Sequence, residues 1–156
     1  MSRAAPRLGL PAWHPAVLIA TGFGIGFLPF APGTWASLAA LPCALAIRNA
    51  AGGRSWAVAA AALAAFLLGW WAASRVARAS GRADPGAVVI DEIAAQWLVL
   101  CIVPLDLSGY TMAFLLFRLF DIAKPWPANW IDRHLKGGFG IMLDDVAAAA
   151  YALLLV

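Results

Sequence analysis

The chain has 156 residues, of which 63% are hydrophobic and only 12% are charged, with a formal net charge of +3. This length suits one domain covering residues 1–156, and the mean hydropathy of +0.82 is far from that of soluble proteins, in which about 25% of residues are charged. The composition indicates a membrane protein and excludes an ordinary soluble globular domain. We expect membrane lipids, and no nucleic acid, among its partners, with a homo-oligomer as an open alternative.

The N-terminal residues 1–19 are expected to be a variable segment of this domain. Their basic start leads to no compact apolar stretch followed by a cleavage site, so we expect no signal peptide. Cys43 and Cys101 lie in apolar segments without metal-ligand or redox spacing. Zinc and redox chemistry are therefore not expected.

The first motif is GFGIGFLPFAPGTW, residues 22–35. Its glycines and prolines exclude a regular helix through residues 29–33, and Thr34 is predicted to stand at a helix start. Backbone N–H groups exposed there could hold a phosphate, to which Thr34 would donate a hydrogen bond. The alternative is a simple helix break, with Gly22 and Gly26 as close-packing positions and Thr34 as the N-cap.

Five apolar segments predict an all-α fold, a polytopic membrane protein with four to five short transmembrane helices joined by irregular motif loops. Residues 55–74 form the clearest span, because they are uncharged and approach the ~20 residues that a spanning helix needs. The other segments are shorter, namely residues 34–47, 93–105, 107–117 and 146–156.

Basic residues predict the orientation of these spans. Arg75, Arg78 and Arg82 follow the clearest span closely, which favours a cytoplasmic location for that end. Alternating spans then place residues 20–34, 75–92 and 121–145 in the cytoplasm. These three segments contain all the polar motifs.

The second motif is VVIDEIAAQW, residues 88–97, with two adjacent carboxylates at the start of an apolar helix. Adjacent residues point about 100° apart on a helix, so Asp91 and Glu92 cannot both be solvated easily while Ile90 and Ile93 enter lipid or core. Two oxygen ligands from one helical turn suit a hard cation such as Mg²⁺. The alternative is a pair of acids that complements the positive helix end.

The third stretch covers residues 117–145 and begins with a mixed-charge face. Arg118, Asp121 and Lys124 are spaced by three residues on one predicted helical face, which Pro125 ends. Cations beside an acidic site can hold a phosphate. The alternative for Arg118 and Asp121 is a structural ion pair.

The same stretch ends with another cation and another pair of acids. Lys136 stands beside two glycines, and Asp144 and Asp145 are predicted at the entrance of the last apolar segment. The alternative for Lys136 is a surface for lipid headgroups.

The motifs GFGIGFLPFAPGTW, DPGAVVIDEIAAQW, FRLFDIAKPWP and DRHLKGGFGIMLDD, in this order and spacing, resemble the phosphatidylglycerophosphatase A family over residues 20–150. The resemblance implies a helical enzyme of the bacterial inner membrane whose active site faces the cytoplasm. It also implies Mg²⁺-dependent hydrolysis of phosphatidylglycerophosphate to phosphatidylglycerol and inorganic phosphate. Ala36, Ala95 and Ala149 stand where relatives commonly have glycine, an exchange that preserves close helix packing.

The chain lacks the Cys-x₅-Arg and DxDx[TV] signatures of phosphatases that form a covalent intermediate. We therefore expect water activated by a metal ion. The expected ligands of Mg²⁺, direct or through bound water, are Asp91, Glu92, Asp144 and Asp145. The expected catalytic residues are Asp121, Asp145 and Glu92, and the expected phosphate-binding residues are Thr34, Arg118, Lys124 and Lys136.

Other classes of membrane protein are less consistent with these patterns. A transporter or proton relay would also keep carboxylates beside apolar helices, but it would favour single acids at mid-span and often internal repeats. A lipid phosphotransferase would carry a DGxxAR signature, which is absent. A scaffold without activity would not explain carboxylates grouped with lysines and glycines.

Overall fold

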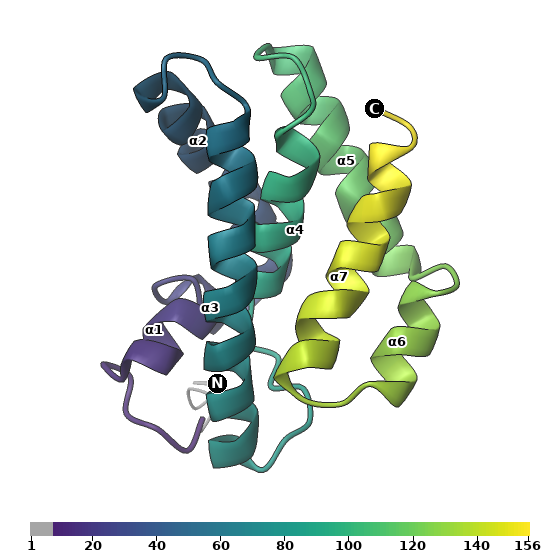
Figure 1. Cartoon of the computed structure of the whole chain (residues 1–156). Helices are drawn as coiled ribbons and strands as arrows, with labels where there is room; N and C mark the ends of the chain where they lie inside the picture. Colours follow the sequence, from purple (N-terminus) through teal and green to yellow (C-terminus); the bar gives the residue numbers. More distant parts are fainter. Residues whose placement is uncertain (1–7) are drawn as a thin grey trace.

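The computed structural model describes residues 8–156, which form α-helices and one short 3₁₀ helix and contain no strand (Figure 1). The all-α expectation is confirmed for these residues. The elements are α1 Pro15–Ala20, η1 Ile25–Phe27, α2 Pro32–Ala50, α3 Trp56–Ser80, α4 Ile90–Leu100, α5 Leu107–Ala123, α6 Ala128–His134 and α7 Gly138–Leu153.

Helix α3 is the longest helix among the described residues, and it contacts α1, α4 and α7 (Figure 1). Its residues are mostly alanine and leucine, which favour helix, and Gly81 ends it in the left-handed conformation with φ 68°. Small side chains let its neighbours approach closely. A Cβ added at Gly69 would lie 2.8 Å from Met142 Sδ of α7.

Within residues 8–156, α3 alone is long and apolar enough to cross a membrane on length and composition. The expected four to five spans therefore stay a prediction. At 1.5 Å per residue, α2 and α5 are about 28 and 26 Å long, close to the ~30 Å of a hydrocarbon core, whereas α4 is only about 17 Å long.

Helix α4 lies between the two apolar clusters of the core. It contacts α2, α3, α5 and α7. We predicted one apolar segment over residues 93–105, but the helix ends at Leu100 and a turn follows. Pro104 explains the difference, because proline removes a backbone donor and disfavours helix at the preceding residue.

Three expectations about helix boundaries were wrong. The last helix begins at Gly138, so Asp144 and Asp145 lie in its second turn rather than at the entrance of a helix starting at residue 146. Residues 128–134 form α6 where we expected an irregular loop. Helix α2 begins at Pro32 with Ala31 as its N-cap, so Thr34 lies in the first turn and does not cap the helix. Proline is favoured at the first helical position, which explains why α2 begins at Pro32, two residues before the expected start.

The connections between the helices lie at the two ends of the bundle (Figure 1). The α3–α4 and α6–α7 connections lie at one end, and the α2–α3 and α4–α5 turns lie at the other end with the C-terminus. Between the ends, Ala36, Ala95 and Ala149 are fully buried. Alanine at these positions is thus compatible with close packing of α2, α4 and α7.

Candidate active site

A cavity of about 160 Å³ opens at the end of the bundle that holds the α3–α4 connection. Residues from all three sequence motifs line it. Seven of the eight acidic residues of the chain are among them, and Asp106 is the exception. The lining acids are Asp84, Asp91, Glu92, Asp121, Asp132, Asp144 and Asp145.

Three of these acids form a compact cluster inside the cavity. Asp91 and Glu92 come from the first turn of α4, and Asp145 comes from the second turn of α7, which packs against α4. Each offers a carboxylate oxygen, and the three oxygens lie within 4.8 Å of one another. The sequence expectation that these residues act together is consistent with this geometry.

The cluster has the chemistry of a cation site. Asp91 Oδ1, Glu92 Oε2 and Asp145 Oδ2 are buried and have no hydrogen-bond partner. Buried carboxylates without partners cost several kcal/mol each, and like charges at this separation disfavour ionisation together. Oxygen ligands of this kind suit Mg²⁺ or Ca²⁺. The residues present therefore fit the expected divalent cation.

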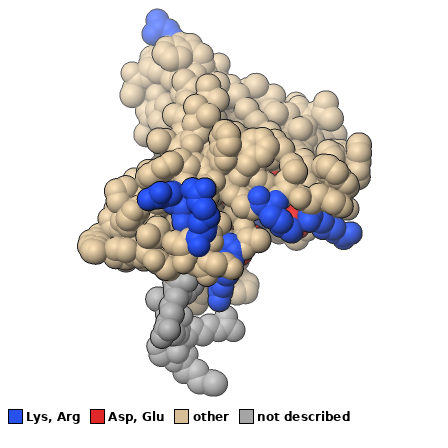
Figure 2. Space-filling view, turned by 60° about the horizontal axis from the view of Figure 1, so that its bottom comes forward, with Lys and Arg blue, Asp and Glu red and all other residues tan. Residues whose placement is uncertain are grey.

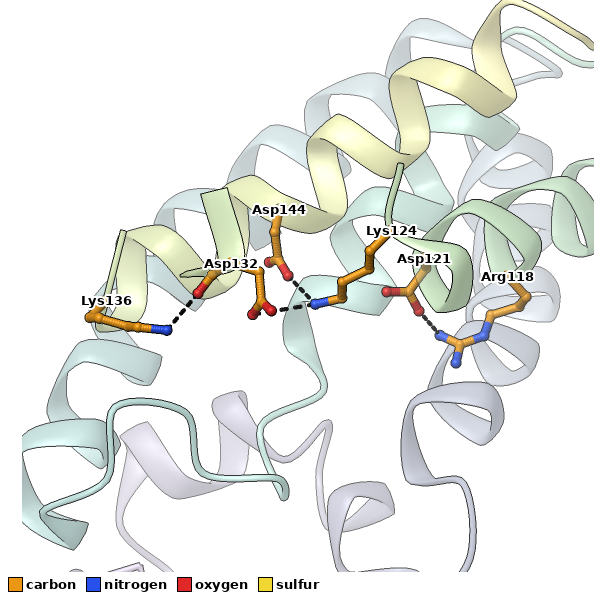
Figure 3. A network of polar contacts seen from close by, with 6 residues as sticks. All are labelled: Arg118, Asp121, Lys124, Asp132, Lys136 and Asp144. Carbon is orange, nitrogen blue, oxygen red and sulfur yellow. Dashed lines mark hydrogen bonds and ion pairs between the residues drawn. The ribbon is translucent and has the colours of Figure 1, made fainter. Parts of the chain in front are cut away.

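Asp144 lies beside the cluster but pairs with a lysine instead of joining it. Lys124 Nζ lies 2.5 Å from Asp144 Oδ2 and 3.5 Å from Asp132 Oδ1 (Figure 3). Burial lowers the pKa of Lys124. The hydrogen bond to Asp144 and the negative charge of Asp144 raise it by a larger amount, so the net shift of the pKa is upward. Lys124 thus stays a cation at the cavity wall. Asp144 Oδ1 has no partner.

A second ion pair joins two residues of α5. Arg118 Nη1 donates to Asp121 Oδ2 at 2.5 Å (Figure 3). The same nitrogen lies 3.5 Å from Ser37 Oγ of α2. Asp121 lines the cavity, whereas Arg118 and Thr34 are not among its lining residues. The structure therefore places Arg118 behind Asp121, where it orients this carboxylate.

The first motif reaches the cavity through Gly33 rather than through Thr34. A Cβ added at Gly33 would lie 1.9 Å from Glu92 Oε1. Only a residue without a side chain leaves room for Glu92 at this point. Sequence reasoning missed this role, although a glycine directly before a predicted helix start was a signal for a close approach.

The rim of the cavity carries further charges. Lys136 is exposed and donates from Nζ to the backbone oxygen of Asp132 at 2.7 Å (Figure 3). Basic side chains gather on this end of the molecule, while little of any acidic side chain reaches the surface in the same view (Figure 2). The lysines and arginines at this end can attract an anionic ligand, although the carboxyl groups of Asp84 and Asp132 also reach the cavity mouth.

Sequence reasoning assigned no role to Asp84 or Asp132. Asp84 stands exposed at the cavity mouth, where nearby protein atoms desolvate its carboxyl group and raise its pKa, while Lys124 and Lys136 act to lower it. An acid beside proline and glycine is typical of a turn, so there was no reason in the sequence to assign Asp84 to the site. Asp132 lies on α6, a helix that we did not predict.

The sequence profile of the family described as Phosphatidylglycerophosphatase A matches residues 18–156. The chain is 38% identical to Phosphatidylglycerophosphatase A of Haemophilus influenzae over 157 residues, covering 100% of this chain and 95% of that protein. It is 36% identical to the Escherichia coli protein of the same name over 138 residues, covering 87% of this chain and 76% of that protein.

A third relative carries a different name. The chain is 40% identical over 151 residues to a protein of Bacteroides thetaiotaomicron named putative phosphatidylinositol-3-phosphatase, covering 94% of this chain and 93% of that protein. No solved structure matches the chain.

Proposed function

Because the chain belongs to the phosphatidylglycerophosphatase A family and is a lipid phosphatase of that type, we propose that it hydrolyses phosphatidylglycerophosphate to phosphatidylglycerol and inorganic phosphate with Mg²⁺. The observation that carries this proposal is the cluster of Asp91, Glu92 and Asp145, whose oxygens lie within 4.8 Å of one another. In this proposal the three residues hold the cation, and Asp144 supports the site through its pair with Lys124.

In the proposed reaction, a water oxygen forms a bond to phosphorus and the bond from phosphorus to the glycerol oxygen breaks. The leaving oxygen gains a proton and the water loses one. A bound divalent cation would neutralise phosphate oxygens and lower the pKa of water. Asp121, oriented by Arg118, accepts the proton of the water, and Lys124 and Lys136 bind the phosphate oxygens as charge develops on them.

We also propose that the protein is embedded in the bacterial inner membrane by several of its helices, with the cavity on the cytoplasmic side. Large apolar side chains are exposed along α3 and α5, among them Leu63, Leu67, Met112, Leu115 and Leu119. Soluble monomers rarely expose apolar patches of more than a few hundred Å². Arg75, Arg78 and Arg82, near the cavity end of α3, favour the cytoplasmic side.

The relative from Bacteroides thetaiotaomicron motivates a second candidate substrate, a phosphatidylinositol 3-phosphate lipid. Both candidate substrates are anionic lipids with a phosphomonoester on the headgroup. The basic rim and the carboxylate cluster suit this shared phosphomonoester. The two substrates differ in the alcohol that carries the phosphate, which is glycerol in one and inositol in the other.

The test is phosphate release by the purified protein in detergent micelles. The substrates are phosphatidylglycerophosphate, phosphatidylinositol 3-phosphate and phosphatidic acid, each with Mg²⁺ and with excess chelator. We expect the highest kcat/KM for phosphatidylglycerophosphate and no release in chelator. A higher kcat/KM for the inositol lipid would replace the proposed substrate, and equal release in chelator would refute the metal-dependent reaction.

A further inference from the structure

Gln96 is a fully buried polar residue of α4 with unsatisfied hydrogen-bonding groups. Its side chain is 0% exposed, and neither the amide nitrogen Nε2 nor the amide oxygen Oε1 has a partner. Leaving a buried polar group unpaired costs about 1–3 kcal/mol. A fold that otherwise fills the space around α4 with alanine, valine and leucine would be more stable with an apolar residue here.

Gln96 stands one helical turn after Glu92 on the same face of α4. Residues four apart on a helix have Cβ atoms about 5–6 Å apart, so their long side chains can meet. The same face continues into Val99 and Leu100, which belong to the apolar core. Gln96 thus lies between the carboxylate cluster and the core.

Glu92 has a carboxylate oxygen without a hydrogen-bond partner, and the amide of Gln96 carries a donor that suits it. Gly33 borders Glu92 Oε1, where an added Cβ would lie 1.9 Å away, and Glu92 Oε2 is buried without a partner. An amide N–H is a donor, and a carboxylate oxygen is an acceptor. The structure shows no direct hydrogen bond between the two side chains, so the unmet donor of Gln96 and the unmet acceptor of Glu92 are complementary across one water.

We propose that Gln96 is a positioning residue: its Nε2 donates to one ordered water that in turn donates to Glu92 Oε2, and this bridge holds the carboxylate ready for a divalent cation. The inference rests on the proposed function, because it assumes that Glu92 is a ligand. Groups that orient metal ligands typically change metal affinity or activity about 10- to 100-fold when they are removed.

The test is calorimetric titration of the full-length protein in detergent with Mg²⁺, for the wild type and Gln96→Met. Methionine has a similar length and no amide. We expect affinity for Mg²⁺ to fall about 10- to 100-fold. The Tm of the cation-free protein should stay close to that of the wild type, because methionine removes the unpaired amide oxygen Oε1 together with the proposed hydrogen bond.

The matched control is Tyr110→Phe. The hydroxyl of Tyr110 is also buried and without a partner, but it lies in the first turn of α5, about 12 Å along the helix from Arg118. Its removal should leave Mg²⁺ affinity unchanged. Gln96→Asn, which keeps the amide but shortens the side chain, should also weaken Mg²⁺ binding and serves if Gln96→Met does not fold.

Wild-type Mg²⁺ affinity in the folded Gln96 variants would overturn the positioning role and leave the proposed function intact. A wild-type protein that binds no Mg²⁺ would overturn both. Equal loss of affinity in Tyr110→Phe would also overturn the inference, because it would show that any buried polar group has the same effect.

Discussion

The cavity holds three buried carboxylates close together, those of Asp91, Glu92 and Asp145. Their proximity determines the expected effect of each substitution. Asp91→Asn, Glu92→Gln and Asp145→Asn keep shape and remove charge. We expect each to lower kcat on the order of 10²-fold or more, because a metal ligand is lost, while the protein still folds. Phosphate release and Tm in detergent, measured on the same preparations, check this expectation.

Asp106→Asn is the matched control for these variants. Asp106 is the acid outside the cavity, and it caps α5 by accepting from the backbone N–H of Gly109. Asparagine caps helices about as well as aspartate, so this variant should be near wild type. If all three cluster variants also kept kcat within a few-fold of wild type, the metal site would be refuted, and Asp91 and Glu92 would merely complement the positive end of α4.

The pair of Lys124 and Asp144 allows stability to be separated from activity. Lys124→Met leaves Asp144 buried without its cation. We expect a loss of about 1–3 kcal/mol in unfolding free energy, less than for a fully buried pair because Lys124 is one-third exposed. Adding Asp144→Asn should recover stability but not activity, since phosphate binding still lacks Lys124. Denaturant unfolding and phosphate release measure the two effects, and recovery of both would show that the pair is only structural.

At the scale of elements, the start of α2 is packed against the first turn of α4 through Gly33 and Glu92. Gly33→Ala should displace Glu92, since its Cβ would lie 1.9 Å from Oε1. We expect weaker Mg²⁺ affinity and at least about 10-fold lower kcat. Titration with Mg²⁺ and phosphate release provide the measurements.

Gly86→Ala is the control for this contact. Gly86 also lines the cavity, but an added Cβ would meet no atom within 4 Å. It should behave like wild type. Equal kcat in the two variants would show that the close approach at Gly33 has no functional consequence.

The sequence predicted those elements whose signals are local. Apolar runs and the prolines near them located α2, α3 and α5 approximately, and the acids at the start of α4 were placed in its first turn. Helix α6 was missed because the segment of residues 128–134 is short and mixes aromatic with charged residues, so it shows no apolar run. The start of α7 was missed because three glycines precede the apolar run, although Gly138 and Gly140 in fact pack against Ser74 and Leu135.

The partners of individual side chains could not be predicted, because they depend on how helices face one another. Asp144 and Asp145 are adjacent in sequence, yet they point about 100° apart on α7. Asp145 therefore joins the α4 carboxylates, whereas Asp144 meets Lys124 at the end of α5. Gln96 lies within the second motif, but its residue type and position suggested no role there, and only its complete burial without a partner revealed one.

At the scale of the whole molecule, basic side chains gather at one end of the bundle (Figure 2), the end at which the cavity lined by acids opens. If that end faces the cytoplasm, single cysteines at exposed Ala83 and His134 should resist a membrane-impermeant thiol reagent in intact spheroplasts and react after lysis. Cys43 and Cys101 must first be replaced by serine.

A cysteine at Ser55, in the turn at the opposite end, is the matched control. It should react in intact spheroplasts. Labelling of the Ala83 and His134 positions before lysis, with protection of the Ser55 position, would reverse the proposed orientation.

The most direct test of the cation-dependent reaction follows bound metal and turnover in one sample. Protein is stripped of metal, verified by elemental analysis, and titrated with Mn²⁺ as a spectroscopically visible substitute for Mg²⁺. Bound Mn²⁺ and phosphate release from phosphatidylglycerophosphate are recorded at each step. We expect release to rise in proportion to bound Mn²⁺ in the wild type and to stay at background in Asp145→Asn. Full turnover by the metal-free wild type would contradict the metal site.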